Sequence, residues 1–232
     1  FKRPQSYYRD ILWKTGAPLY IAVHAPVPAG KEEKITRWGW PDVHPSWTWP
    51  GEEGHDFRVL VYSACDQVEL FVNGRSLGLQ PSGKEEKYTA TFSLPYEPGE
   101  LKAVGYLGGK AAAEISLQTA GEAASLSLKP DRANLKADGQ DLAYVTVELL
   151  DVNGRMHPCA DREVFFTVQG EGALIAVGSA NPTSTEDYVG HVRSTFHGRC
   201  LVAVKAARQA GTIRLRAQAD GVAPAEVEIH VK

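Results

Sequence analysis

Four tryptophans lie close together in two short segments of this sequence and are its strongest candidates for binding chemistry. Trp38 and Trp40 flank a glycine, Trp47 and Trp49 flank a threonine, and a proline follows each pair. Sugars place their apolar C–H faces on aromatic rings, so exposed indoles on a loop suit a carbohydrate ligand. The same rings suit a core or an interface, provided each indole N–H finds an acceptor. The sequence leaves both interpretations open.

Acid–base chemistry has no recognisable centre in the sequence. A glycosidase needs two carboxylates that flank the scissile bond. The glutamate pairs at residues 52–53 and 85–86 lie in charged segments, which favours solvated surface positions. The nucleophile-elbow, phosphate-loop, H-E-x-x-H and EF-hand patterns are absent from the sequence. We therefore expect no catalytic residue and no enzymatic activity in this chain.

The seven histidines and three cysteines do not form a metal-binding pattern. His44 and His55 lie near the tryptophans, but a zinc site needs three or four converging ligands. Residues 151–154 partly match a calcium loop, although a turn explains them better because the later acidic ligand is missing. Cys65 and Cys200 lie in apolar segments, where we expect them to be small buried hydrophobes. We predict no metal and no cofactor.

The composition is that of an ordinary globular protein. The chain has 232 residues, of which 43% are hydrophobic and 23% charged, and its formal net charge is −3. The basic surplus that marks nucleic-acid binding is missing. No apolar run reaches the length of a membrane span, roughly 20 residues. Residues 1–4 also lack the apolar stretch of a signal peptide, so we expect a mature product or an excised part of a longer chain.

Residues 4–15 predict one short helix. Pro4 suits a first helical position, because its missing N–H has no intrahelical partner there. Tyr8 and Ile11 follow at helical spacing. Gly16 suits the C-terminal stop. A helix this short is marginal in water, so it must dock on another part of the protein.

From residue 19 onward the hydrophobic pattern has a period of two, which is typical of half-buried strands. Asn73-Gly74 between alternating segments predicts a hairpin, because a type I′ turn needs positive φ at both central residues. Gly108-Gly109 is a second hairpin candidate. The expected strands in this half are residues 19–23, 57–64, 68–72, 75–78, 88–94, 101–106 and 111–117, with a long structured loop at 25–54.

The pattern restarts after residues 119–124, which are small and mark the expected domain boundary. Turn signals at a spacing of roughly 8–12 residues are typical of a sandwich. The expected strands here are residues 126–128, 142–150, 164–168, 194–196, 200–206, 212–219 and 227–231. We therefore predict an all-β protein of two tandem immunoglobulin-like antiparallel β-sandwiches preceded by one short helix. The helical segment is 1–16, the first sandwich 17–118 and the second 119–232.

Several segments, taken in order, resemble the region that follows the catalytic barrel in bacterial family-2 glycoside hydrolases, the β-galactosidase and β-glucuronidase relatives. Residues 47–54 (WTWPGEEG) and 68–78 (VELFVNGRSLG) carry the resemblance in the first half. The opening FKRPQSYY is similar to the last helix of that family's barrel. The second half is similar to the family's further C-terminal immunoglobulin-like domain, through residues 137–141, 145–151, 153–154, 164–168, 178–182 and 196–198.

The resemblance implies a non-catalytic accessory region of a β-glycosidase, of the β-galactosidase type. The family's catalytic glutamates lie in the barrel, upstream of this chain, so no residue here inherits them. The implied partner is the barrel of the same parent chain, which these domains would buttress, with roles in shaping its cleft or in oligomer contacts. The parent would be periplasmic or secreted. Trp38, Trp40, Trp47 and Trp49 are the candidate substrate-binding residues.

Two other functions remain open at this point. Clustered tryptophans also suit a stand-alone carbohydrate-binding module. Tandem sandwiches also suit a spacer or an adhesin. The coding sequence directly upstream would separate these from the accessory region, because only the accessory region requires a barrel there.

Overall fold

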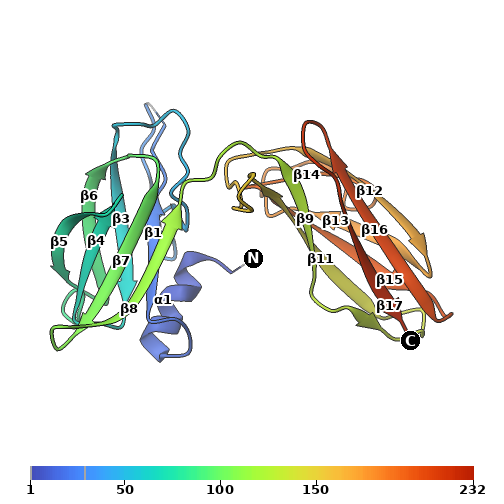
Figure 1. Ribbon diagram of the computed structural model, residues 1–232, viewed down its shortest axis with the longest axis horizontal. Helices are drawn as coiled ribbons and strands as arrows, with labels where there is room; N and C mark the ends of the chain where they lie inside the picture. The colour runs from blue at the N-terminus through green and yellow to red at the C-terminus, as the bar shows by residue number, and fades with distance from the viewer. Residues whose placement is uncertain (1, 29) are drawn as a thin grey trace. The chain divides into compact units, whose positions relative to one another are not determined.

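The computed structural model describes residues 2–28 and 30–232, which form two compact units with their boundary between Thr119 and Ala120 (Figure 1). Phe1, part of the expected helical segment, and Ala29, part of the expected loop, lie outside the described residues. Each unit consists of two β-sheets, and one short helix precedes the first. The predicted all-β fold is therefore confirmed. In the described part of the chain, no helix is long and apolar enough to cross a membrane.

The first unit stacks one four-stranded sheet, in the order β2-β1-β3-β6, on another, in the order β5-β4-β7-β8. All strand pairs within these two sheets are antiparallel. The elements are α1 (Pro4–Trp13), β1 (Leu19–His24), β2 (Val43–His44), β3 (Asp56–Ser63), β4 (Gln67–Val72), β5 (Arg75–Pro81), β6 (Thr89–Pro95), β7 (Glu100–Leu107) and β8 (Lys110–Gln118).

Helix α1 begins where the sequence predicts, with Pro4 in the first helical turn. Its end was predicted wrongly. Lys14, and not Gly16, adopts the left-handed conformation with φ of 55°, and its backbone N–H bonds to the carbonyls of Asp10 and Ile11. Gly16 has a different role: a Cβ there would lie 3.1 Å from the Asp10 side chain, so the chain passes close to the helix.

Strand β1 is buried on both of its faces, which sets the layers of the first unit. Leu19, Ile21 and Val23 point into the core between the two sheets. Tyr20 and Ala22 point to the opposite face, where they pack with Ile11 of the helix and with residues of β3. The sheet containing β1 is therefore covered by the second sheet on one side and by α1 on the other.

Two hairpins connect strands where the glycine pairs predicted them. Asn73 and Gly74 have φ of 49° and 79° between β4 and β5. Gly108 and Gly109 have φ of 55° and 76° between β7 and β8. Asparagine and glycine tolerate the positive φ that these tight turns require. Both predictions are confirmed.

The second unit stacks a five-stranded sheet, in the order β10-β17-β16-β12-β14, on a four-stranded sheet, in the order β13-β15-β11-β9. The short pair of β10 with β17 is parallel, which the sequence did not predict. The elements are β9 (Ser125–Pro130), β10 (Asn134–Leu135), β11 (Leu142–Leu150), β12 (Glu163–Gly170), β13 (Gly172–Gly178), β14 (Val192–Ser194), β15 (Arg199–Ala206), β16 (Gly211–Ala219) and β17 (Ala225–Val231).

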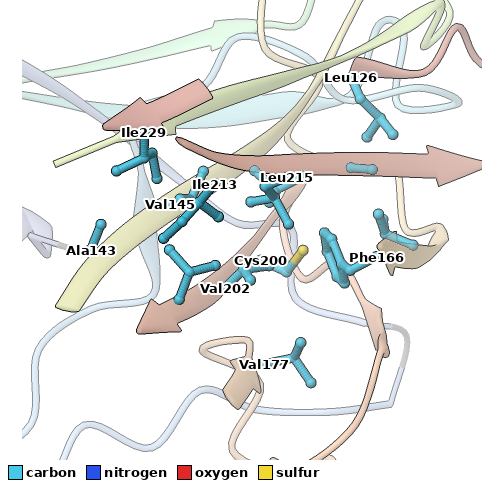
Figure 2. Packing of buried hydrophobic residues seen from close by; sticks show 14 of the residues in the cluster. Leu126, Ala143, Val145, Phe166, Val177, Cys200, Val202, Ile213, Leu215 and Ile229 are labelled. Atoms are coloured by element: carbon cyan, nitrogen blue, oxygen red, sulfur yellow. The ribbon is translucent and has the colours of Figure 1, made fainter. Parts of the chain in front are cut away.

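Branched aliphatic side chains from both sheets fill the core of the second unit (Figure 2). Val145 of β11 and Val202 of β15 lie opposite each other in register, and both are fully buried. Cys200 is part of this core and Cys65 is part of the first unit's core, so both were correctly predicted to be buried. The third cysteine, Cys159, is exposed.

Candidate functional site

The four candidate tryptophans do not converge on one site. Trp47 has 0% of its surface exposed and lies in the core between the two sheets of the first unit. Its Nε1 donates a hydrogen bond to the carbonyl of Glu97 at 2.9 Å, and its ring stands edge-on to Tyr96 with centroids 5.0 Å apart. An indole enclosed in this way has no free face on which a sugar can stack. Trp47 has the role of a core residue.

Trp49 is partly buried beside the same core. Its ring lies 5.4 Å from that of Phe57, and its Nε1 donates to the carbonyl of Ser46 at 3.3 Å. The backbone N–H of Trp49 also donates to the hydroxyl of Tyr96 at 3.1 Å. These contacts close the long loop onto the sandwich. Trp49 therefore anchors the loop from its inner side.

Trp40 lies on the other face of the sheet and is 37% exposed. Its Nε1 donates to the hydroxyl of Tyr62 at 3.0 Å, and its ring lies 5.3 Å from that of Tyr8. The indole is thus held by helix α1 and by β3 while part of its surface stays open. This combination of a fixed orientation and an accessible ring is what a stacking residue requires.

Trp38 is 90% exposed, the highest exposure among the described large hydrophobic residues. Its only described ring partner is Arg37, whose guanidinium carbon lies 5.6 Å from the ring centroid. Exposure of an indole ring to water is unfavourable compared with its burial. A ring this exposed is therefore available to a ligand or a protein surface. Of the four candidates, only Trp38 and Trp40 are exposed, whereas Trp49 is partly buried and Trp47 is fully buried.

A group of tyrosines that the sequence analysis did not single out connects these tryptophans to the fold. We define the outer aromatic cluster as Tyr7, Tyr8, Tyr20, Trp40 and Tyr62. Tyr7 stacks on Tyr20 with centroids 4.2 Å apart, and Tyr20 stacks on Tyr62 at 5.9 Å. Tyr8 stands edge-on to Tyr62 at 5.2 Å, and its hydroxyl donates to the carbonyl of Lys87. The cluster joins α1, β1, β3 and the loop before β2.

The sequence held a signal for this cluster. Residues 19–23 are apolar at every position, which is unusual for a strand that exposes one face. Tyr20 and Tyr62 are direct partners in the register of β1 and β3. The apolar run indicates a second buried layer, but only the strand register places the two tyrosines opposite each other.

The cluster is suited to packing and hydrogen bonding, and not to proton transfer. Burial raises the pKa of Tyr62 above its ordinary value, against the opposing effect of the Trp40 hydrogen bond. Burial and, to a lesser degree, the nearby Tyr88 also raise the pKa of Tyr8. Both phenols therefore stay protonated through the neutral pH range. Tyr62 accepts the hydrogen bond of the Trp40 indole, and Tyr8 donates to the backbone carbonyl of Lys87.

Other apolar side chains of the helix and of the loop are exposed as well. Trp13 at the end of α1 is 69% exposed, and Leu12, Val27 and Ile35 are also exposed. Single exposed apolar side chains are common, so these residues alone do not define a binding site.

Among the residues that the structure describes, no three histidine, cysteine or acidic side chains are placed to hold a metal ion. Glu52 is paired with His55 at 2.8 Å on the surface. Asp151 uses its carboxylate to accept the backbone N–H groups of Asn153 and Arg155, which confirms the predicted turn. These carboxylates therefore have structural partners.

Two family models match the chain in sequence. Residues 126–228 match "Glycoside hydrolase family 2 C-terminal domain 5", and residues 54–113 match a domain of unknown function, DUF4982. The chain is 40% identical over 188 residues to the beta-galactosidase BoGH2A of Bacteroides ovatus, a match that covers 81% of this chain and 22% of the relative. It is 32% identical over 171 residues to a putative beta-glucuronidase of Formosa agariphila, covering 72% of this chain and 16% of the relative.

A solved structure shares the fold over the whole chain. A glycosyl hydrolase family 2 member from Bacteroides cellulosilyticus superposes with a TM-score of 0.93 at 38% identity, covering 100% of this chain and 30% of that structure. The present chain thus spans less than a third of the length of each of these relatives.

Proposed function

Because this chain is a C-terminal region of the family-2 glycoside hydrolases, we propose that it is the non-catalytic accessory part of a β-galactosidase-type enzyme. In this proposal the two sandwiches support a catalytic barrel that lies elsewhere in the parent protein. The parent cleaves a β-glycosidic bond with carboxylates of the barrel, and this chain contributes none of them. The placement of the parent in the periplasm or outside the cell rests on family membership alone.

The main support for the proposal is that the sheet β2-β1-β3-β6 is covered on both faces, by the second sheet on one side and by α1 on the other. A sandwich sheet ordinarily exposes its outer face. Here that face is apolar and aromatic, and α1 docks on it through Ile11 and the outer aromatic cluster. Leu12 and Trp13 remain exposed on the helix. This arrangement supports a seam in which α1 packs on the sandwich with one side and on the barrel with the other.

We further propose that Trp38 and Trp40 approach the substrate cleft of the parent enzyme. Trp38 is exposed, and Trp40 is oriented by Tyr62 and Tyr8. Trp47 and Trp49 are assigned to the support of the loop, because their indole N–H groups and rings are used inside the unit.

The first test measures hydrolysis of nitrophenyl β-galactoside by the purified chain. No turnover above background is expected, and clear turnover would contradict the non-catalytic role. The second test reads the coding sequence directly upstream, where a barrel with two catalytic glutamates is expected. An upstream sequence without a barrel would favour a spacer or an adhesin.

The cleft assignment is tested in the full-length parent. Trp38→Ala and Trp40→Ala should raise KM for a β-galactoside, whereas Tyr144→Ala should not, because Tyr144 is exposed in the second unit. Equal KM values for all three variants would contradict the placement of the tryptophans at the cleft. The proposed accessory role would not be affected by this result.

A stand-alone carbohydrate-binding module is the second candidate, and the exposure of Trp38 favours it. The test titrates the chain with galactosides and with plant and host glycans while tryptophan fluorescence is recorded. A saturable shift that disappears in Trp38→Ala would support this function. An unchanged spectrum with every glycan would exclude it for the sugars tried.

A further inference from the structure

The tetrapeptide Val-Asn-Gly-Arg occurs twice in this chain, as residues 72–75 and as residues 152–155. The first copy forms the hairpin turn between β4 and β5. The second copy forms the turn after β11, between Leu150 and Met156, which are antiparallel partners. Because the two copies share their local sequence, any difference in their chemistry has to come from the fold.

Asn-Gly is the dipeptide in which asparagine deamidates most readily, because glycine has no side chain to hinder attack by its backbone nitrogen. The glycine nitrogen attacks Cγ of the asparagine and the bond from Cγ to the side-chain nitrogen breaks. The side-chain nitrogen leaves as ammonia, with the proton of the glycine N–H. Water then opens the resulting succinimide ring at either carbonyl, which gives aspartate or isoaspartate. Water is the only co-reactant.

The fold holds the carboxamide of Asn73 at both ends. Its Nδ2 donates to the carbonyl of Pro98 at 3.1 Å, and its Oδ1 accepts the backbone N–H of Glu100 at 2.8 Å. Gly99, between these two partners, lies so close that a Cβ on it would overlap Oδ1 of Asn73. The side chain therefore cannot turn toward the nitrogen of Gly74 without losing both hydrogen bonds.

The carboxamide of Asn153 has no such bridge. Within the described part of the chain, this side chain makes no hydrogen bond to another residue, and the backbone N–H of Asn153 donates to Oδ1 of Asp151 at 2.8 Å. The attacking nitrogen, that of Gly154, donates to the carbonyl of Asp151 at 3.0 Å, so this one turn bond has to open before the reaction. Residues 152–155 are all exposed, and water can replace the turn bond there.

We propose that Asn153 is a site of spontaneous deamidation, which ages to aspartate and isoaspartate under conditions that leave Asn73 intact. Exposure does not separate the two asparagines, because both are exposed. They differ in what has to break before attack: two side-chain hydrogen bonds to residues 98–100 at Asn73, and one backbone turn bond at Asn153. The inference concerns the covalent chemistry of the chain itself and does not depend on the activity of the parent enzyme.

Isoaspartate at position 153 disturbs a set of hydrogen bonds around the buried side chain of Asp151. Oδ1 of Asp151 accepts the backbone N–H groups of Asn153 and Arg155, each at 2.8 Å, and Oδ2 accepts that of Gly121 at 2.9 Å. Isoaspartate lengthens the main chain by one methylene group between residues 153 and 154, which displaces the N–H of Arg155 from the carboxylate. Gly121 lies in the segment that begins the second unit, so we expect this segment to loosen as Asn153 ages.

The first experiment incubates the intact folded chain at pH 8 and follows the peptides that contain residues 72–75 and 152–155 by mass spectrometry, with fragmentation that distinguishes isoaspartate from aspartate. Each rate is divided by the rate of the same peptide in the chain unfolded by guanidinium chloride. Asn153 should then convert about fivefold faster than Asn73 or more, the factor expected for one additional hydrogen bond that has to break. Equal rates, or faster conversion of Asn73, would overturn the proposal.

Asn153→Gln is the control for the site of reaction. Glutamine has to close a less favourable six-membered ring, so the product at residues 152–155 should disappear in this variant. A product that persists there would assign the reaction to another residue. Absence of conversion at Asn153 in the folded wild type, over a time in which the unfolded chain converts, would likewise contradict the proposal.

Gly99→Ala tests the origin of the protection at Asn73, because the added Cβ displaces the Asn73 carboxamide. In the folded variant, Asn73 should convert several-fold faster than in the wild type, while Asn153 keeps its rate. An unchanged rate at Asn73 would refute protection by the bridge to residues 98–100. If the variant does not fold, the comparison of the two copies within the wild type still decides the proposal.

The last experiment measures amide hydrogen exchange at the start of the second unit in fresh and aged chains. Exchange around Gly121 should be about two- to fivefold faster in the isoaspartate fraction, as expected for a weakened hydrogen bond. Aged Asn153→Gln should show no such increase. Equal exchange in the fresh and the isoaspartate-containing chains would refute the coupling between residue 153 and Gly121.

Discussion

The guanidinium of Arg193, a fully buried residue of β14, lies 5.0 Å from the ring centroid of the exposed Tyr188. The same guanidinium donates to the carbonyl of Glu186 at 3.0 Å and to the hydroxyl of Ser179 at 3.2 Å, and it lies 3.6 Å from the Glu186 carboxylate. A buried charge is tolerated when it is paired and hydrogen-bonded. Arg193 therefore holds the segment between β13 and β14 in one conformation.

Replacement of Arg193 by Met should destabilise the second unit by about 1–3 kcal/mol, because the carbonyl of Glu186 and the hydroxyl of Ser179 lose their donor. The measurement is urea unfolding followed by far-UV circular dichroism. Arg214→Met is the matched control, since the Arg214–Glu228 pair is exposed and should contribute about 1 kcal/mol or less. Equal losses in the two variants would show that Arg193 has no special role.

The buried carboxylate of Glu148 should make the second unit sensitive to acid. Burial alone would raise the pKa of Glu148, but the hydrogen bond from Lys129 and the charge of Arg199 outweigh burial and lower it. A carboxyl with a lowered pKa stabilises the fold above its unfolded-state pKa and loses this contribution as the pH falls through the folded-state value. Stability should therefore decline below about pH 4.5.

Glu148→Gln tests this origin of the acid sensitivity. The variant should lose about 1.5–3 kcal/mol at pH 7, as expected for hydrogen bonds to a charged group. As the pH falls from the unfolded-state pKa through the lower folded-state pKa, the difference from the wild type should shrink, because the wild type then loses the contribution of the charged carboxylate. Glu163→Gln, at an exposed position of β12, is the control and should change little over the same pH range. A constant difference for Glu148→Gln across pH would refute the mechanism.

The tryptophans should differ sharply in their contribution to stability. Trp47→Ala should cost about 3–5 kcal/mol, because it opens a cavity in the core and leaves the Glu97 carbonyl without its donor. Trp38→Ala should stay within about 0.5 kcal/mol of the wild type. Chemical unfolding of the first unit, with the remaining tryptophans as fluorescent probes, measures both. A large loss of stability in Trp38→Ala would mean that the Trp38 ring is buried in solution.

Thiol labelling should distinguish the three cysteines. Burial raises the pKa of Cys200 to about 12, against the opposing charge of Arg193, so its thiolate is scarce at pH 8. Burial also raises the pKa of Cys65. Burial raises the pKa of Cys159 as well, so the contrast rests on exposure. A disulfide reagent at pH 8 should modify only the exposed Cys159 in the native chain and all three thiols in urea. Cys159→Ser should abolish native labelling; fast labelling that persists would contradict the buried positions.

Hairpins and amphipathic strands were predictable from the sequence because their signals are local. Asn73-Gly74 fixes a turn by its backbone preferences, and the alternation in residues 142–150 fixes which side chains enter the core. Strand β13 was missed: its apolar run between glycines shows no alternation, so periodicity did not separate it from a loop. Residues 194–196 were predicted as a strand, whereas β14 is Val192–Ser194 and only Ser194 is shared.

The candidate site was less predictable than the fold, because exposure depends on partners that are distant in sequence. Trp40 and Trp47 occur in similar short motifs, yet Tyr62 holds one at the outer face and Tyr96 encloses the other in the core. No local pattern distinguishes them.

The docking of α1 on the first sandwich also limits how this protein can be divided. A chain that began after Gly16 would keep both sheets but would uncover Tyr20, Leu60 and Tyr62, which the helix and its aromatic side chains now shield. Such an apolar face on a free domain promotes self-association. The helix is thus an integral part of the first domain in practical terms, and any domain graft, swap or truncation has to carry it along.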